Sequence, residues 1–163
     1  MTADEKKTET AIFGAGCFWG VEETFRLLKG VLSTEVGYAG GRLDKPTYEA
    51  VCEGNTGHAE VLKISFDPAR ISYADLLAVF WSCHNPTTLN RQGPDVGEQY
   101  RSVIFTLSPE QEAQALKSKE ILDKAKVWRD PVVTQIKPFI NFYKAEEYHQ
   151  QYLSKHGLGN CHL

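Results

Sequence analysis

A strand that passes into a helix through a glycine-rich turn is the sequence feature that most constrains this fold. The apolar residues 11–13 are typical of a buried strand, and the amphipathic run over residues 18–29 predicts a helix. The turn between them reads Gly14-Ala15-Gly16-Cys17-Phe18-Trp19-Gly20. It places Cys17 at the N-terminus of the predicted helix.

Two interpretations of Cys17 follow from this position. Unpaired backbone N–H groups and the helix dipole favour negative charge at a helix N-terminus, so a thiolate is stabilised there and becomes a better nucleophile. Glycines on both sides would let a substrate approach the sulfur closely. Alternatively, Cys17 is a small apolar residue buried in a tight turn. The turn by itself leaves both interpretations open.

Length and charge narrow the class of protein. The 163 residues suffice for one domain with a sizeable core, so we expect a single catalytic domain over residues 1–163, with flexible ends at 1–8 and 157–163. The net charge of −3 gives no general attraction to nucleic acid or to an anionic membrane surface. The charged N-terminal residues contain no apolar core, and no later run has membrane-spanning length, which predicts a cytoplasmic protein.

Hydrophobic periodicity and turn residues predict alternating strands and helices. Strands are expected at residues 11–13, 31–38, 58–66, 100–107 and 131–136, and helical segments at 18–29, 48–52, 73–81, 109–126 and 145–155. Ser72 with Asp75 resembles a capping box, and Ser108 followed by Pro109 is a strong helix start. Residues 84–98 lack periodicity and suggest a functional loop. This order predicts an α+β fold, in which helices pack on a mixed sheet in two layers.

Glu60 is the unusual residue of the strand predicted at 58–66. Alternation places it on the same face as Leu62, Ile64 and Phe66. A carboxylate that faces a core must be paired or must hold its proton with a raised pKa. The alternative is that Glu60 lies at the frayed start of the strand, bonded to water or to a nearby arginine.

The cysteines are too few for a disulfide scaffold, and none forms a C-x-x-C motif; they are Cys17, Cys52, Cys83 and Cys161. The Cys-His pairs at 83–84 and 161–162 lack a second ligand pair at zinc-site spacing, so no metal is expected. A cysteine at a helix start and another on a glycine-rich terminal segment suit a redox cycle. The first becomes a sulfenic acid and the second condenses with it to a disulfide. Alternatively, the terminal thiol is incidental.

Several ordered motifs resemble the peptide methionine sulfoxide reductase A family. They are G-C-F-W-G at 16–20 followed by Glu22, G-H-A-E-V at 57–61, F-D-P at 66–68, F-W at 80–81, R-Q-G at 91–93, Asp95, and Q-Y-R-S at 99–102. The resemblance extends from about residue 11 to residue 161. It implies a ferredoxin-like core and the activity of a peptide-methionine (S)-S-oxide reductase.

By this resemblance, Cys17 is the nucleophile that attacks the sulfoxide sulfur, and Glu60 protonates the sulfoxide oxygen. A glutamic acid that works near pH 7 needs a pKa raised by roughly two to three units, which burial can supply. Tyr48 and Tyr100 match the two hydroxyl donors to the sulfoxide oxygen. A phenol has a pKa of about 10, so both hydroxyls would remain neutral donors at neutral pH.

The resemblance also assigns the substrate pocket. Phe18 and Trp19 match the aromatic wall that receives the terminal methyl group of the substrate. Asp95 matches a residue near the substrate's main chain, although a solvated loop carboxylate is the alternative. We expect His58 to pack or hydrogen-bond beside Glu60 without a catalytic role.

Recycling is the remaining implication. The resemblance places Cys161 at the resolving position, so we expect a disulfide between Cys17 and Cys161 that thioredoxin reduces directly, without a bound cofactor. Longer family members carry a further recycling cysteine beyond this point. Cys52 and Cys83 are candidates for a secondary exchange. The expected partners are thioredoxin and either oxidised proteins or free methionine sulfoxide, and we expect a monomer.

Two other functions remain as alternatives. A cysteine hydrolase or acyl-transfer enzyme would use His58 or His84 as the base for Cys17. A non-catalytic protein would bind oxidised peptides, or store metal through its Cys and His residues. The first requires a histidine within hydrogen-bond reach of the sulfur, and it gives Cys161 no purpose.

Overall fold

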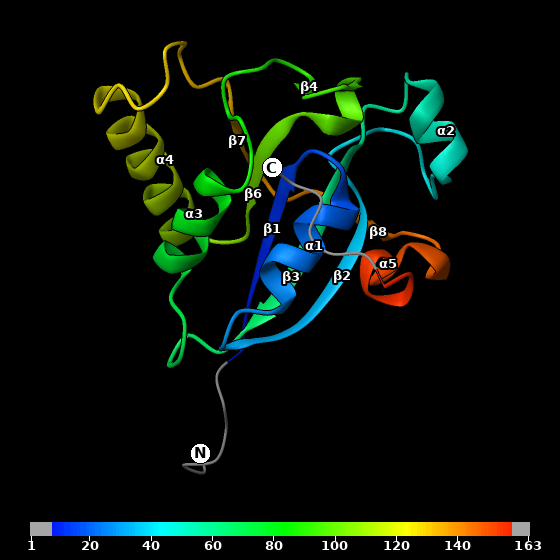
Figure 1. Ribbon diagram of the computed structural model, residues 1–163, viewed down its shortest axis with the longest axis horizontal. Coiled ribbons are helices and arrows are strands. Elements are labelled where there is room, and N and C mark those ends of the chain that lie inside the picture. Colours follow the sequence, from blue (N-terminus) through cyan, green and yellow to red (C-terminus); the bar gives the residue numbers. More distant parts are fainter. Residues whose placement is uncertain (1–7, 158–163) are drawn as a thin grey trace.

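The computed structural model describes residues 8–157 (Figure 1). The predictions made for residues 1–7 and 158–163, Cys161 included, concern positions outside the described residues.

The centre of the fold is one six-stranded sheet. In spatial order its strands are β7 (Gln135–Pro138), β6 (Ser102–Thr106), β1 (Glu9–Ala15), β3 (Ala59–Phe66), β2 (Val31–Ala39) and β8 (Phe142–Lys144). The pair β6–β7 is parallel and the other pairs are antiparallel. The predicted mixed sheet is therefore confirmed.

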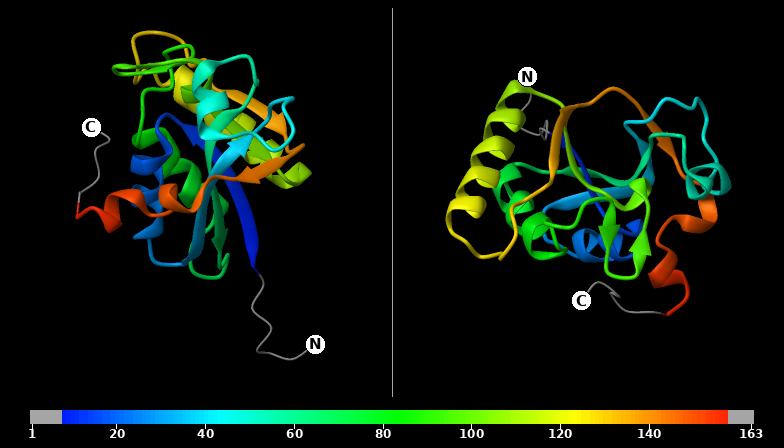
Figure 2. Two further views of the ribbon diagram at one scale, coloured as in Figure 1. Left: turned by 90° about the vertical axis from the view of Figure 1, so that its right-hand side faces the viewer. Right: turned by 90° about the horizontal axis from the view of Figure 1, so that it is seen from above.

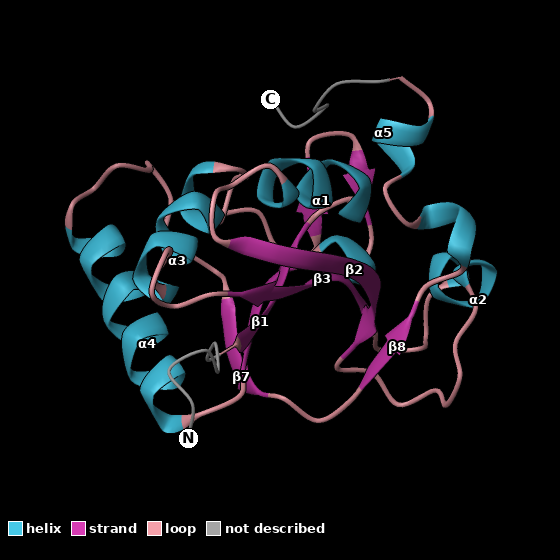
Figure 3. Cartoon of the chain, turned by 90° about the horizontal axis from the view of Figure 1, so that it is seen from below, coloured by secondary structure: helices cyan, strands magenta, loops and turns pink. Residues whose placement is uncertain are grey.

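Helices connect the four central strands in a ferredoxin-like order. Helix α1 (Phe18–Arg26) joins β1 to β2, and α3 (Tyr73–Ser82) lies between β3 and β6. One cluster of buried side chains joins both helices to β1, β2 and β3, and Figure 3 shows them on the same side of the sheet. A smaller buried cluster on the other face packs against Phe142. The α+β prediction in two layers is confirmed.

The remaining helices lie at opposite edges of the sheet. Helix α4 (Pro109–Lys124) lies beside β7, whereas α2 (Tyr48–Glu53) and α5 (Tyr152–Lys155) lie toward β8, as Figures 1 and 2 show. No helix in the described part of the chain is long and apolar enough to cross a membrane.

The helix caps predicted from the sequence are present in the structure. Ser72 accepts a hydrogen bond from Asp75 N–H, and the Asp75 side chain accepts one from Ser72 N–H, which makes a complete capping box for α3. Ser108 accepts from Gln111 N–H and Pro109 occupies the first turn of α4. Helix starts were predictable because the side chain and the backbone group that it caps are only three residues apart.

The prediction of one continuous helix over residues 145–155 is wrong. The segment instead contains the 3₁₀ turn η2 (Glu147–His149) and the short α5, separated by Gln151 in the left-handed conformation with φ 52°. The side chain of Gln150 accepts from Val36 N–H at 2.9 Å and donates to the carbonyls of Val36 and Ala145, each at 3.0 Å. These bonds to β2 hold the segment out of a helix.

The end of the sheet also differs from the prediction. The strand expected at 131–136 begins only at Gln135, because Val132 N–H bonds the Asp123 side chain and Val133 N–H bonds the carbonyl of Pro86. Strand β8 was not predicted. The loop at 84–98 contains a short hairpin of β4 (Arg91–Gln92) and β5 (Asp95–Val96), followed by the 3₁₀ turn η1 (Glu98–Tyr100).

Candidate active site

Cys17 lies at the N-cap of α1, as the sequence predicted. Gly16 has φ +97°, a conformation that favours glycine and lets the chain turn sharply out of β1. The cysteine is partly exposed and directly precedes the first helical N–H groups. It is therefore a thiol that reaches the surface at a helix N-terminus and not a fully buried core residue.

Glu60 is anchored at the same helix N-terminus. Its side chain is buried, with 1% of its surface exposed, and Oε1 accepts a hydrogen bond from Phe18 N–H at 3.2 Å. The pKa of Glu60 is raised to about 8: burial is the main cause, the bond from Phe18 N–H lowers the pKa in part, and the charge of Asp95 adds a smaller rise. Glu60 therefore carries a proton at neutral pH, and the frayed-strand alternative is wrong.

The second carboxyl oxygen of Glu60 has an unusual environment. Oε2 is buried and has no hydrogen-bond partner among residues 8–157. A buried hydroxyl without a partner is costly, and such groups in native proteins call for an explanation. A protonated Oε2 is a donor that an incoming oxygen atom can satisfy.

Two tyrosines lie within electrostatic range of Glu60. Tyr48 is the first residue of α2 and Tyr100 ends η1. Burial is the main cause that raises the pKa of each phenol well above its ordinary value, and a negative charge on Glu60 raises both further. The thiol of Cys17 also acts on Tyr100, and Tyr48 hydrogen-bonds with the thiol of Cys52. Both hydroxyls therefore stay neutral donors beside the acid and the thiol.

Aromatic rings surround this group on the α1 side. Phe18 is fully buried, with its ring centroid 5.8 Å from that of Tyr38. Trp19 is partly exposed and stacks on Tyr152, at 3.8 Å between ring centroids and with 8° between the ring planes. The two predicted pocket residues thus provide a buried ring and an accessible one, next to Cys17 in the chain.

The sequence analysis missed two residues that support the site. Glu146 accepts a hydrogen bond from the Tyr38 hydroxyl at 2.8 Å and another from Tyr48 N–H at 2.9 Å. His149 accepts one from Trp19 Nε1–H at 3.0 Å. Both belong to the segment that was predicted to be helical, and no local signal in the sequence distinguishes them from the polar face of a helix.

Asp95 and His58 have different relations to the site. Asp95 lies on β5, and its charge raises the pKa of both Glu60 and Tyr100, so it belongs to the same electrostatic neighbourhood. His58 accepts from Gly41 N–H at 3.0 Å, and its Nε2 bonds the carbonyl of Leu43 at 2.7 Å. The expected hydrogen bonds of His58 are present, but they hold the loop after β2 and do not involve Glu60.

The other two described cysteines differ in reactivity. Burial raises the pKa of Cys83 to about 12, and its thiol donates to the carbonyl of Phe80 at 3.4 Å, which makes it a poor exchange partner. Cys52 is exposed on α2, where its thiol hydrogen-bonds with Tyr48 and Gln99. No three His, Cys, Asp or Glu side chains within residues 8–157 lie close enough to hold a metal ion.

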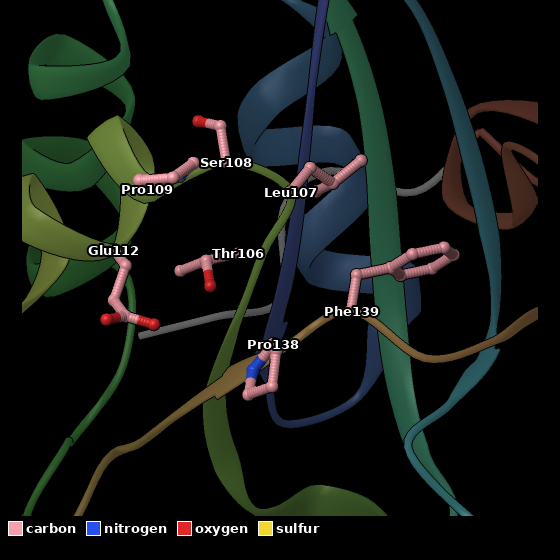
Figure 4. A pocket seen from close by; sticks show the side chains of 7 residues that line it. All are labelled: Thr106, Leu107, Ser108, Pro109, Glu112, Pro138 and Phe139. Atoms are coloured by element: carbon pink, nitrogen blue, oxygen red, sulfur yellow. The ribbon is translucent and has the colours of Figure 1, made fainter.

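A surface cavity of about 460 Å³ lies away from this chemistry (Figure 4). It is formed where β6 and β7 end and α4 begins, by residues 106–109 with Glu112, Pro138 and Phe139. Its lining contains no cysteine, histidine or tyrosine. The residues that could carry a reaction gather instead at the start of α1 and at the other end of β6.

Comparisons with known proteins identify the family of this chain. The sequence matches the family "Peptide methionine sulfoxide reductase" over residues 9–163. A protein of Methanoculleus marisnigri named peptide methionine sulfoxide reductase MsrA is 58% identical over 98% of this chain and 97% of its own. The reduced form of Mxr1 from Saccharomyces cerevisiae has a TM-score of 0.89 and 39% identity, covering 99% of this chain and 92% of that chain.

A second structure shows this fold with a partner. Mxr1 in complex with Trx2 has a TM-score of 0.65 and 30% identity, covering 93% of this chain and 89% of that chain. The agreement extends over nearly the whole sequence in each of these comparisons. The chain therefore belongs to the peptide methionine sulfoxide reductase family.

Proposed function

We propose that this protein reduces methionine S-sulfoxide, free or in proteins, to methionine, and that Cys17 and Glu60 carry the chemistry. The observation that carries this proposal is the carboxyl of Glu60, which is buried and protonated at neutral pH and is bonded to the helix N-terminus that bears Cys17. The family supplies the substrate class. We further propose that the chain is one catalytic domain.

In the first step, the sulfur of Cys17 attacks the sulfoxide sulfur while Glu60 Oε2 donates its proton to the sulfoxide oxygen. The attack forms a bond between the two sulfur atoms. The oxygen, now a hydroxyl, then passes to the Cys17 sulfur: a new S–O bond forms there while the substrate's S–O bond and the bond between the two sulfurs break. Methionine leaves, Cys17 becomes a sulfenic acid, and the proton of the Cys17 thiol replaces the one that Glu60 donated. Methionine sulfoxide is reduced by two electrons and Cys17 is oxidised by two. The hydroxyls of Tyr48 and Tyr100 donate to the same oxygen as negative charge develops on it.

The rings of Phe18 and Trp19 would bind the methyl group on the reacting sulfur. Aromatic rings also suit the positive character of a protonated sulfoxide sulfur. Asp95 would bind the substrate's main chain from the loop before η1.

In the second step, the thiol of Cys161 attacks the sulfenic sulfur of Cys17, forming a disulfide and releasing water. Thioredoxin then reduces this disulfide with its own dithiol, a proposal supported by the complex of Mxr1 with Trx2. We propose that the protein is a monomer and that it works in the cytoplasm, where thioredoxin keeps thiols reduced.

The alternative of a cysteine hydrolase finds no support in the histidines. Both ring nitrogens of His58 bond the backbone of residues 41 and 43. Those of His84 contact the carbonyl of Phe80 at 2.8 Å and the hydroxyl of Ser102 at 2.7 Å. Each imidazole thus has a structural role in the described fold.

A single-turnover experiment tests the proposal. Reduced protein is incubated with methionine S-sulfoxide without reductant, methionine is counted, and disulfides are mapped by mass spectrometry. We expect about one methionine per chain and a Cys17–Cys161 disulfide. Cys17→Ser is the control and should release no methionine. If the wild-type protein releases none either, the proposed activity is overturned. A product disulfide with Cys52 or Cys83 would overturn only the direct resolution by Cys161.

A further inference from the structure

His149 is a fully buried histidine whose ring packs against aromatic residues of the proposed site. Its side chain is 0% exposed. The imidazole centroid lies 5.2 Å from the ring of Phe18, 5.8 Å from that of Trp19 and 4.5 Å from that of Tyr48. One ring therefore contacts both proposed pocket residues and one of the proposed hydroxyl donors.

The hydrogen bond of His149 fixes its tautomer. Trp19 Nε1–H can only donate, so the Nδ1 atom that receives it at 3.0 Å must present a lone pair, and the ring proton lies on Nε2. That Nε2 is buried and has no hydrogen-bond partner among residues 8–157; the Oε1 atom of Glu146 is 4.0 Å away.

These facts separate a packing role from a hydrogen-bonding role. A phenyl ring would fill the same space and contact the same rings without burying a nitrogen that lacks a partner, which is costly. What the imidazole adds to a phenyl ring is the acceptor Nδ1. That atom faces Trp19.

Trp19 needs such an acceptor because stacking alone does not fix its orientation. Its indole stacks on Tyr152 with nearly parallel planes, 8° apart. A stacked indole can turn over or slide in its own plane with little loss of contact, whereas a hydrogen bond from Nε1 is directional. The bond to Nδ1 selects one stacked orientation.

We propose that His149 is a positioning residue: its Nδ1 holds the indole of Trp19 in the orientation that closes the methyl pocket, and so sets selectivity for the size of the alkyl group on the sulfoxide sulfur. This inference rests on the proposed function, in which Phe18 and Trp19 bind that group. His149 itself does not touch the reacting atoms in this proposal.

The test compares His149→Phe, which keeps a ring but removes the acceptor, with His149→Asn, whose amide oxygen can replace Nδ1. Steady-state kinetics with dithiothreitol are measured for methionine S-sulfoxide and for its S-ethyl analogue. For His149→Phe we expect KM for the methyl substrate to rise about five- to tenfold, the effect of one lost hydrogen bond. The methyl-over-ethyl ratio of kcat/KM should fall, with kcat nearly unchanged.

His149→Asn should recover most of the methyl preference. A Trp19→Phe background provides the second test, because it has no indole N–H: adding His149→Phe there should leave the methyl-over-ethyl ratio where Trp19→Phe alone puts it. His156→Phe is the matched control: His156 is exposed, its ring contacts Tyr152 with 4.2 Å between the centroids, and phenylalanine keeps a ring there, so this variant should keep the wild-type ratio.

Several results would overturn the inference. They are a wild-type methyl-over-ethyl ratio in His149→Phe, no recovery in His149→Asn, or a further fall of the ratio when His149→Phe is added to Trp19→Phe. Thermal midpoints are measured for each variant. If His149→Phe does not fold, His149→Asn and Trp19→Phe alone decide, since the first should keep the ratio and the second should lose it. Failure of the wild type to reduce either substrate would instead overturn the proposed function.

Discussion

The carboxyl of Glu60 shows how burial changes the chemistry of one residue. It shares a strand face with the core residues Leu62 and Ile64, where an ionised carboxylate would be strongly destabilised. A single backbone donor, Phe18 N–H, favours the charged form, and burial outweighs it. The residue is therefore an acid at neutral pH.

The pH dependence of activity should report this acid. Because the pKa of Glu60 is about 8, its protonated form prevails below pH 8 and is lost above it, so kcat should fall roughly tenfold per unit at higher pH. In Glu60→Gln, which keeps the size and the acceptor for Phe18 N–H, this limb should disappear. Its kcat should drop by about 10²- to 10⁴-fold. An unchanged limb in the variant would assign it to another group.

The same carboxyl should also make the fold less stable at high pH. A folded-state pKa raised from 4.5 to about 8 means that the folded protein holds the proton more tightly than the unfolded chain. The free energy of unfolding should therefore fall as pH rises from 4.5 to 8, by up to roughly 1.4 kcal/mol per unit from this group. Glu60→Gln should remove that slope and be more stable than the wild type at pH 9.

Glu22 offers a matched control for both measurements. It is also buried, burial also raises its pKa, and it accepts hydrogen bonds from the Thr34 hydroxyl at 2.7 Å and from Gln151 N–H at 2.6 Å. Glu22→Gln should flatten part of the stability profile while leaving the pH limb of kcat in place. Loss of that limb in Glu22→Gln would contradict the assignment to Glu60.

At the scale of elements, residues 145–157, the segment after β8, are attached to the rest of the fold mainly through side-chain hydrogen bonds, beside one backbone bond from Ala145 N–H to the carbonyl of Val36. Gln150 bonds both backbone groups of Val36 in β2, and Gln151 N–H bonds Glu22 in α1. Trp19 contacts the same segment through His149 and Tyr152. The segment thus connects the site helix to the part of the chain that leads to Cys161.

Replacing Gln150 tests this account. Gln150→Leu removes three hydrogen bonds. It leaves Val36 N–H and the Ala145 carbonyl without the Gln150 side chain as partner, at a cost of roughly 1–3 kcal/mol for each unsatisfied group, whereas the Val36 carbonyl keeps its bond from Ala145 N–H at 2.9 Å. Hydrogen exchange at residues 145–157 should become at least tenfold faster, while β1 and β3 keep their protection. Equal loss of protection throughout the sheet would show instead that the segment is part of the global folding unit.

At the scale of the whole molecule, the antiparallel pairs of the sheet assemble the site. Gly14 and Ala15, which lead into the Cys17 turn, pair with Val103 and Ser102 at the start of β6, close to Tyr100. Glu60 lies opposite Tyr38, whose hydroxyl bonds Glu146. Residues separated by more than a hundred positions thus meet at one end of the sheet.

The two-thiol cycle makes a prediction at this scale. Cys161→Ser should still release about one methionine per chain in a single turnover, because the first step needs only Cys17. It should lose turnover with thioredoxin, because no disulfide forms for thioredoxin to reduce. Cys83→Ser is the matched control and should turn over normally, since that buried thiol lies outside the cycle. Full thioredoxin-dependent turnover in Cys161→Ser would contradict the proposed role.

The sequence could predict what depends on near neighbours in the chain. The turn at Cys17, the caps at Ser72 and Ser108, and the mixed α+β order were all confirmed, because each follows from residues a few positions apart. Alternation also singled out Glu60. Its environment could not be settled there, because the pKa depends on burial under segments distant in sequence.

What only the tertiary structure decided is the fate of residues 145–155 and the support of the pocket. A local pattern predicts a helix there, yet the Gln150 side chain bonds β2 and the backbone N–H of Gln151 bonds the Glu22 side chain, and these contacts interrupt the helix. The hydrogen bond between Trp19 and His149 spans 130 positions, so no local rule contains it. The sequence by itself thus determined the turn that presents Cys17. Contacts between segments distant in sequence raised the pKa of Glu60 and placed His149 as the hydrogen-bond acceptor of Trp19.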